Sequence, residues 1–176
     1  MRLMAILTGV LTLLGCARST RSLAPVSGFD GEKYMGVWYE IGRFPHFFER
    51  GLTSVTAEYT LLDDGTIRVV NRGYNSERGK WKTATARARF KGDRTVGLLK
   101  VTFFWPISAD YKILALDDPG YTHAVVTSGT FDYLWILSRS PEMDEAVYSG
   151  LVRFAESSGF DVSRLERVKQ ERIFPR

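Results

Sequence analysis

Alternation of apolar and polar residues is the dominant pattern of this chain from residue 37 onward. In the run 52–62, every second residue from Val55 is apolar, with Ala57, Tyr59 and Leu61 following it. Such alternation indicates an extended strand that buries one face. Comparable short runs occupy residues 37–41, 66–72, 82–90, 96–105, 111–116, 121–127 and 131–138. The pattern therefore predicts eight β-strands.

Turn residues separate these runs. Asp63-Asp64-Gly65 is a tight hairpin signal, and residues 75–79, 91–94, 117–120 and 128–130 carry similar turn chemistry. Brief connections favour antiparallel pairing of each strand with the next, and closing the sheet removes its two exposed edges. We expect an all-β fold, an eight-stranded antiparallel up-and-down β-barrel.

Residues 140–159 carry the one clear helical periodicity. Ser140 and Pro141 are typical of a helix start, and Gly159 is typical of a helix end. The apolar positions that recur at helical spacing, and that we expect to cover the outside of the barrel, are Met143, Val147, Leu151 and Phe154. Residues 165–170 predict a short ninth strand beside the first.

The N-terminus has the layout of a secretory leader. A basic start, Met1-Arg2, precedes an apolar stretch, residues 3–14, which is too short for the roughly 20 residues of a membrane-spanning helix. The sole cysteine follows in Leu13-Leu14-Gly15-Cys16, which resembles a bacterial lipobox, where the leader is removed and the cysteine is acylated. An ordinary signal peptide with an incidental cysteine is the alternative.

The lipobox resemblance divides the chain into three parts. Residues 1–15 form the lipoprotein signal peptide, residues 16–28 a lipidated stalk that we expect to be flexible because it is small and polar, and residues 29–176 one domain. By the same resemblance, Ala17 after the cysteine implies transfer to the outer membrane. Stable anchoring takes more than one acyl group.

Charge and motifs argue against several classes of function. The 24 basic and 20 acidic residues give a net charge of +4, spread along the chain, which does not mark a nucleic-acid surface. His46 and His123 lack metal-ligand spacing, so we expect two surface histidines and no metal. No phosphate-binding, dinucleotide or nucleophile motif occurs, and we expect neither a cofactor nor an enzymatic activity.

Two segments, one in the first predicted strand and one at the end of the eighth, resemble the lipocalin family. Residues 36–40, Gly-Val-Trp-Tyr-Glu, match the family's Gly-x-Trp opening, and residues 132–139 end in a matching Leu-Ser-Arg. Together with the lipobox and with segments 47–51, 63–65, 71–75 and 99–104, they resemble the bacterial outer-membrane lipoprotein branch of lipocalins and its apolipoprotein D relatives. The likeness runs from about Phe29 to the C-terminus.

The resemblance implies a structural plug at one end of the barrel, formed by Trp38 and Arg139. In the family the arginine lies over the tryptophan, an arrangement that contributes on the order of 1 kcal/mol when partly desolvated. Contact of Arg139 with a ligand is the alternative, and we favour the plug.

With one end plugged, the other is expected to open into a cavity for one small guest. The inward candidates by alternation are Ala57, Tyr59, Val69, Ala84, Ala86, Phe90, Val101, Phe103, Ile113, Tyr133 and Trp135. Small residues such as the alanines leave room for a guest inside a closed barrel, although close packing against another sheet is the more common reason for small residues in strands. The resemblance implies a fatty acid or a lysophospholipid as guest, for lipid transport, storage or membrane maintenance. A structural or partner-binding lipoprotein whose barrel is filled by its own side chains is the alternative.

The connection 42–51 is unusually aromatic. By analogy with the long first loop of lipocalins, Phe44, Phe47 and Phe48 are expected to form a lid over the mouth. The alternatives are that these phenylalanines contact the membrane, a second protomer or the barrel rim. Nearby arginines, among them Arg43, Arg50, Arg72 and Arg78, are candidates for binding a head group. The resemblance places the protein on the periplasmic face of the outer membrane through acylated Cys16, and it allows a homodimer without establishing one.

Overall fold

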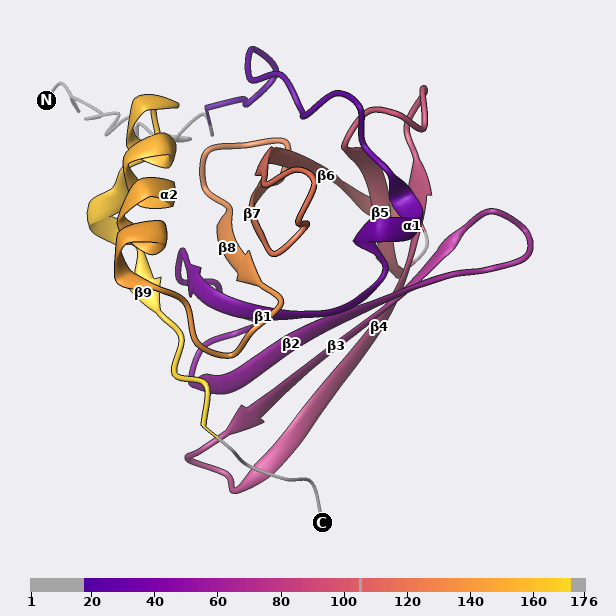
Figure 1. The fold of residues 1–176 in the computed structure, drawn as a ribbon. Helices are drawn as coiled ribbons and strands as arrows, with labels where there is room; N and C mark the ends of the chain where they lie inside the picture. Colours follow the sequence, from indigo (N-terminus) through magenta and orange to yellow (C-terminus); the bar gives the residue numbers. More distant parts are fainter. Residues whose placement is uncertain (1–17, 105, 172–176) are drawn as a thin grey trace, which may run out of the picture.

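The computed structural model describes residues 18–104 and 106–171, and Cys16 lies outside them. One sheet follows the order β2-β3-β4-β5-β6-β7-β8-β1-β9, and β1 also pairs with β2, which closes the barrel (Figure 1). The strands are β1 (Gly36–Arg43), β2 (Leu52–Leu61), β3 (Ile67–Asn75), β4 (Lys80–Phe90), β5 (Leu98–Phe104), β6 (Ile107–Leu116), β7 (His123–Thr127), β8 (Leu134–Ser138) and β9 (Glu166–Arg167).

The predicted antiparallel up-and-down barrel is confirmed. Every neighbouring pair is antiparallel, and β2 and β3 meet across the Asp63–Gly65 turn, with Leu61 opposite Ile67. The short ninth strand is also present, because β9 pairs with the end of β1. Gln170 beyond it donates hydrogen bonds to the carbonyls of Glu40 and Val55, which ties the C-terminal segment to β1 and β2.

The helix α2 (Glu145–Ser157) packs outside the barrel as expected, but it begins later than predicted. Its N-cap is Asp144, whose carboxylate accepts hydrogen bonds from the amides of Ala146 and Val147. Ser140 and Pro141 instead belong to the connection from β8. Two acceptor contacts satisfy two otherwise free helix amides, which explains why the helix starts at the aspartate.

The buried face of α2 also differs from the predicted stripe. Tyr148, Leu151 and Ala155 are buried against the barrel, whereas Val147 and Phe154 are partly exposed. Only Leu151 of the predicted set of four is fully part of this interface, and Met143 contacts it from before the helix. The prediction differs because it followed Val147 and Phe154, which are more hydrophobic than Tyr148 and Ala155, the adjacent residues that face the barrel.

Two short elements complete the fold. The helix α1 (Gly31–Tyr34), which the sequence pattern did not predict, precedes β1, and its last residue, Tyr34, is fully buried. A 3-10 turn, η1 (Val162–Arg164), links α2 to β9. None of the helices in the described residues is long and apolar enough to cross a membrane.

The segment 18–28, predicted to be part of a flexible stalk, is instead docked along the barrel. Figure 1 shows it passing outside the barrel on its way to α1. Its backbone forms bridges at Ser19 and Ser27, and the buried Lys112 side chain on β6 donates hydrogen bonds to the carbonyls of Thr20 and Leu23. Polar composition misled the prediction, because this segment gains its order from hydrogen bonds to the barrel and not from a core of its own.

Candidate functional site

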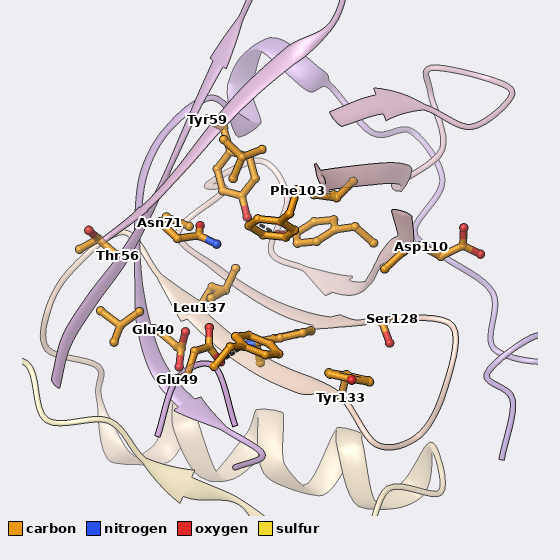
Figure 2. A pocket seen from close by; sticks show the side chains of 18 residues that line it. Glu40, Glu49, Thr56, Tyr59, Asn71, Phe103, Asp110, Ser128, Tyr133 and Leu137 are labelled. Atoms are coloured by element: carbon orange, nitrogen blue, oxygen red, sulfur yellow. Dashed lines mark hydrogen bonds between the residues drawn. The ribbon is translucent and has the colours of Figure 1, made fainter. Parts of the chain in front are cut away.

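A cavity of about 290 Å³ occupies the barrel interior (Figure 2). Its walls come from strands β1–β3, β5, β6 and β8, from the first loop between β1 and β2, and from the connection between β7 and β8. Its lining residues are Glu40, Phe48, Glu49, Val55, Thr56, Ala57, Tyr59, Val69, Asn71, Val101, Phe103, Ala109, Asp110, Tyr111, Ser128, Tyr133, Trp135 and Leu137. Its volume lies close to the lower bound of about 300 Å³ for small-molecule pockets, and a mainly apolar wall with a few polar groups is typical of such sites.

Seven of the eleven predicted cavity residues line this space. They are Ala57, Tyr59, Val69, Val101, Phe103, Tyr133 and Trp135. All seven lie on strands or at strand ends where the period of two holds, so that alternation alone selects the inner face.

The other four predicted cavity residues lie elsewhere. Ala86 and Ile113 are buried in the packed core, and Phe90 packs beside Phe29 at the opposite end of the barrel. Ala84 is exposed, because β4 pairs with β5 only from Arg87 onward and its first half extends past the closed part of the barrel. All four positions follow the alternation, but their depth along the barrel axis determines whether the side chain contacts the core, the cavity or solvent.

Only one of the three predicted lid residues covers the cavity. Phe48 lines it, Phe47 is 83% exposed, and Phe44 is fully buried on the outside of the barrel against Phe160. An irregularity of register between Glu40 and Gly42 shifts the alternation of β1 by one residue. Such a bulge reverses the face of every following side chain, which explains the outward position of Phe44.

The predicted plug has the expected geometry. The guanidinium of Arg139 lies 4.0 Å from the centre of the Trp38 ring, and the ring is fully buried. The same guanidinium donates three hydrogen bonds, to the carbonyls of Lys33, Val37 and Tyr121. These contacts join α1, β1 and the turn before β7, so Arg139 closes the barrel floor and does not reach the cavity.

A tyrosine trio forms the inner end of the cavity. The Tyr111 hydroxyl lies 2.7 Å from the Tyr34 hydroxyl and 2.8 Å from the Tyr59 hydroxyl. Burial raises the pKa of all three phenols, most strongly for Tyr34 and Tyr111. The hydroxyls satisfy one another, so this end of the cavity is neutral and needs no polar partner from a ligand.

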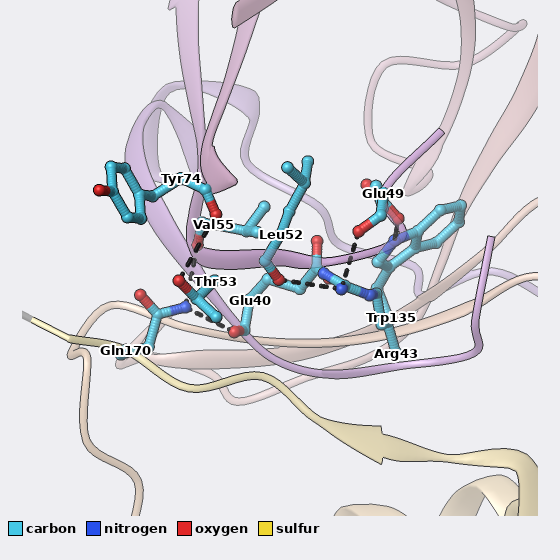
Figure 3. Close-up of polar contacts among 9 residues, drawn as sticks. All are labelled: Glu40, Arg43, Glu49, Leu52, Thr53, Val55, Tyr74, Trp135 and Gln170. Atoms are coloured by element: carbon cyan, nitrogen blue, oxygen red, sulfur yellow. Dashed lines mark hydrogen bonds and ion pairs between the residues drawn. The ribbon is translucent and has the colours of Figure 1, made fainter. Parts of the chain in front are cut away.

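A buried charged cluster lies on the opposite part of the wall (Figure 3). Arg43 donates to a Glu40 carboxylate oxygen at 2.9 Å and to the carbonyls of Glu49 and Leu52 at 3.0 Å. The indole of Trp135 donates to the Glu49 carboxylate at 3.3 Å. Arg43 therefore fastens both ends of the first loop to the barrel and does not offer its charge to a head group at the surface.

Burial sets the protonation of this cluster. Loss of hydration raises the pKa of Glu40 to about 8, assisted by the nearby Glu49, although Arg43 acts in the other direction. The pKa of Glu49 is also raised, again mainly by burial. The ion pair of Glu40 with Arg43 does not contradict this shift, because two carboxyl groups share a single buried cation.

His46 is buried, contrary to the predicted surface position. Its ring stacks between Phe48 and Tyr133, at centroid distances of 5.2 Å and 4.5 Å. Its Nε2 atom is buried and has no hydrogen-bond partner among the described residues. Burial lowers the pKa of His46 to about 4, with Arg43 contributing, so the ring is neutral at physiological pH. It acts as an aromatic spacer that seats Phe48 over the cavity.

His123, by contrast, lies partly exposed beside Asp117 in the turn before β7. In the part of the chain that the structure describes, no group of three His, Cys, Asp or Glu side chains is placed to hold a metal ion.

Ten other residues line the cavity without having been predicted from the sequence, among them Glu40, Glu49 and Tyr111. Glu40 is two positions after Trp38 and therefore shares its inward face, a signal that alternation contained. Tyr111 likewise precedes Ile113 by two. The position of Glu49 carried no such signal, because a loop residue has no fixed period.

Comparison with known proteins agrees with this architecture. A family model described as a lipocalin-like domain matches residues 29–170. The outer membrane lipoprotein Blc of Escherichia coli K12 is 44% identical over 170 residues, which covers 96% of each chain, and that of Vibrio cholerae is 43% identical over 94% of this chain and 96% of the relative. Apolipoprotein D of Mus musculus is 32% identical over 81% of this chain and 77% of its own.

Solved structures show the same fold. Insecticyanin from the tobacco hornworm Manduca sexta superposes with a TM-score of 0.70 at 20% identity, covering 85% of both chains. The similarity to outer membrane lipoproteins along nearly the full sequence places this protein at the outer membrane, held by a lipid anchor. By its sequence match and its closed barrel, the chain belongs to the lipocalin family.

Proposed function

We propose that the cavity binds one fatty acid or one lysophospholipid, with the acyl chain inside the barrel and the head group at the mouth. The predominantly apolar lining of the cavity carries this proposal. Each buried methylene contributes roughly 0.8 kcal/mol, so an acyl chain can bind well with few polar contacts. The volume favours a single chain over the two chains of a diacyl phospholipid. Transport, storage or membrane maintenance would follow from such binding.

The protonation state of the glutamates in the cavity wall is compatible with the binding of an acidic lipid as well as a zwitterionic one. With a pKa of about 8, Glu40 is mostly neutral at pH 7, which removes one negative charge from the cavity wall. The wall therefore repels a fatty acid carboxylate at the mouth less than it would if both glutamates were ionised. The presence of the cavity also speaks against the alternative of a barrel filled by its own side chains.

Fluorescence titration tests the proposal, because Trp135 lies in the cavity wall. Addition of a lysophospholipid or of a fatty acid should change the emission of the protein, and Trp135→Phe should abolish most of that change. Ala57→Phe fills part of the cavity and should weaken binding at least several-fold. Thr85→Phe places the same ring at an exposed position of β4 and serves as the matched control.

Two results would count against lipid binding in the cavity. One is the absence of lipid in mass spectra of the purified protein together with a flat titration. The other is equal loss of affinity in Ala57→Phe and Thr85→Phe, which would place the ligand outside the cavity.

The protein is further proposed to act without catalysis. Lysophospholipid incubated with it should therefore be recovered intact. Hydrolysis that increases with the protein concentration would refute this.

A further inference from the structure

The docked N-terminal segment begins at the open end of the barrel. The carbonyl of Arg18 accepts a hydrogen bond from the Phe131 amide at 2.9 Å, and its guanidinium lies over the Phe131 ring at 4.7 Å. Phe131 belongs to the connection between β7 and β8. Ser128 and Tyr133, the first and last residues of this connection, line the cavity. The chain therefore reaches the barrel beside the mouth, and from there it runs to the floor.

Several buried contacts fix this starting point. The Thr20 amide donates to the Gly129 carbonyl at 3.1 Å, and the Thr20 hydroxyl donates to the Ser128 carbonyl at 2.7 Å. Thr20 is fully buried, and its own carbonyl accepts from the Lys112 ammonium at 2.7 Å. Releasing the segment would leave the Lys112 charge without its carbonyl partners, which is costly in a buried setting.

The acylation site is close to this fixed point along the chain. Cys16 precedes Arg18 by two residues, and two residues span at most about 7 Å. A membrane that holds acyl groups on Cys16 must therefore lie next to the β7–β8 connection. A long flexible stalk would have left the orientation of the barrel free.

Exposed apolar side chains gather at the same end. Phe47 in the first loop is 83% exposed, Ile107 at the start of β6 is 76% exposed, and Phe103 near the end of β5 is 44% exposed. Phe47 packs edge-on against Phe48, which lines the cavity together with Phe103. We call Phe47, Phe48, Phe103 and Ile107 the apolar rim. Large exposed apolar groups around an opening are typical of an interaction surface.

Basic residues lie next to the apolar rim. The Lys82 ammonium donates to the Phe48 carbonyl at 2.8 Å, which places the start of β4 beside the first loop. Exposed cations in this loop and in the β3–β4 hairpin are Arg50, Arg78, Lys80 and Lys82, with Glu77 as an exposed acid among them. Each cation near an anionic lipid surface adds to the attraction between the protein and that surface.

From these observations we infer that the open end of the barrel rests on the membrane surface, with the apolar rim inserted among the lipids. The short tether brings the mouth to the bilayer, the exposed rings and Ile107 bind its apolar part, and the cations bind acidic head groups. A ligand can then pass between bilayer and cavity without crossing water. This orientation does not depend on which lipid the cavity holds.

Site-specific quenching tests the orientation. The acylated full-length protein is reconstituted in vesicles of phosphatidylethanolamine and phosphatidylglycerol, and single cysteines are introduced at exposed positions and labelled with a polarity-sensitive dye. Phe47→Cys and Ile107→Cys report the rim. Asp63→Cys reports the β2–β3 turn at the floor, and Val147→Cys reports the outer face of α2. A phospholipid with a nitroxide on its acyl chain should quench the two rim labels several-fold and leave the other two nearly unchanged.

Other outcomes overturn the inference. Equal quenching at Phe47→Cys and Asp63→Cys would mean that the barrel turns freely on its tether, and quenching of Val147→Cys alone would mean that it lies on its side. Rim labels that sense an apolar environment but resist the lipid quencher would indicate a second copy of this chain on the rim. Loss of lipid binding in the cavity would refute the proposed function and leave this pattern of quenching intact.

Discussion

The two ends of the barrel each contain a partly or fully buried arginine, and these two arginines have different roles. At the floor, Arg139 donates only to neutral carbonyls and lies over Trp38, with part of its side chain in contact with solvent. At the cavity wall, Arg43 is buried between Glu40 and the first loop. The floor therefore provides stability that varies little with pH, whereas the cavity wall contains buried groups that titrate.

Folding and binding therefore depend on different regions of one barrel. Side chains fill the floor around Trp38 and Tyr34, whose rings lie 4.8 Å apart. The interior widens above them because Ala57 and the valines of β2, β3 and β5 are smaller than those rings. Substitutions at the floor should change stability, and substitutions at the wall should change binding and its dependence on pH.

The largest expected effect is at the floor. Trp38→Ala removes a fully buried indole and the partner of Arg139, and it should lower the free energy of unfolding by about 3–5 kcal/mol. Trp81→Ala is the control, because Trp81 is only half-buried and contacts Tyr74 on the neighbouring strand. Urea denaturation followed by circular dichroism measures both. An equal loss of unfolding free energy in the two variants would contradict a special role of the floor in stability.

A somewhat smaller effect is expected at the wall. Arg43→Met deletes the cation between two buried carboxyl groups and frees the first loop, and it should cost about 3 kcal/mol at pH 8. The cost should shrink at pH 5, because Glu40, with a pKa of about 8, is then protonated and no longer needs the cation. A pH-independent cost would contradict the buried charged cluster.

The wild-type protein should lose stability as the pH rises. Glu40 has an ordinary pKa of 4.5 in the unfolded chain and a pKa of about 8 when folded, so the folded state holds the extra proton between these values. The contribution is complete below about pH 4.5 and disappears as the pH passes through about 8. Glu40→Gln should flatten this slope in urea titrations at several pH values, and a slope unchanged by the substitution would assign it to another group.

The smallest effect is expected for His46. Its pKa falls from 6.5 in the unfolded chain to about 4 when folded, so its contribution to stability is complete above about pH 6.5 and is lost as the pH falls through about 4. His46→Phe keeps the stacking on Phe48 and Tyr133 and removes the unpartnered nitrogen, which should raise stability by about 1 kcal/mol. It should also remove the acid-side slope, and a destabilised variant would show that the nitrogen has a partner in solution.

Local sequence determined most of the fold. Alternation and turn residues fixed the eight strands and their antiparallel order, because a strand with one buried face must repeat every two residues and a hairpin needs only its own turn. The resemblance of the segments around Trp38 and Arg139 to lipocalins indicated the floor, and alternation on β2, β3, β5 and β8 indicated seven residues of the cavity wall.

The remaining features depend on contacts between segments that are far apart in the sequence. The register irregularity in β1 sent Phe44 outward, and the extension of β4 beyond its pairing with β5 left Ala84 in solvent. The docking of residues 18–28 depends on Lys112, which lies about 90 residues further along the chain in β6. Each of these outcomes depends on partners distant in sequence, and a local pattern of apolar and polar residues contains no record of them.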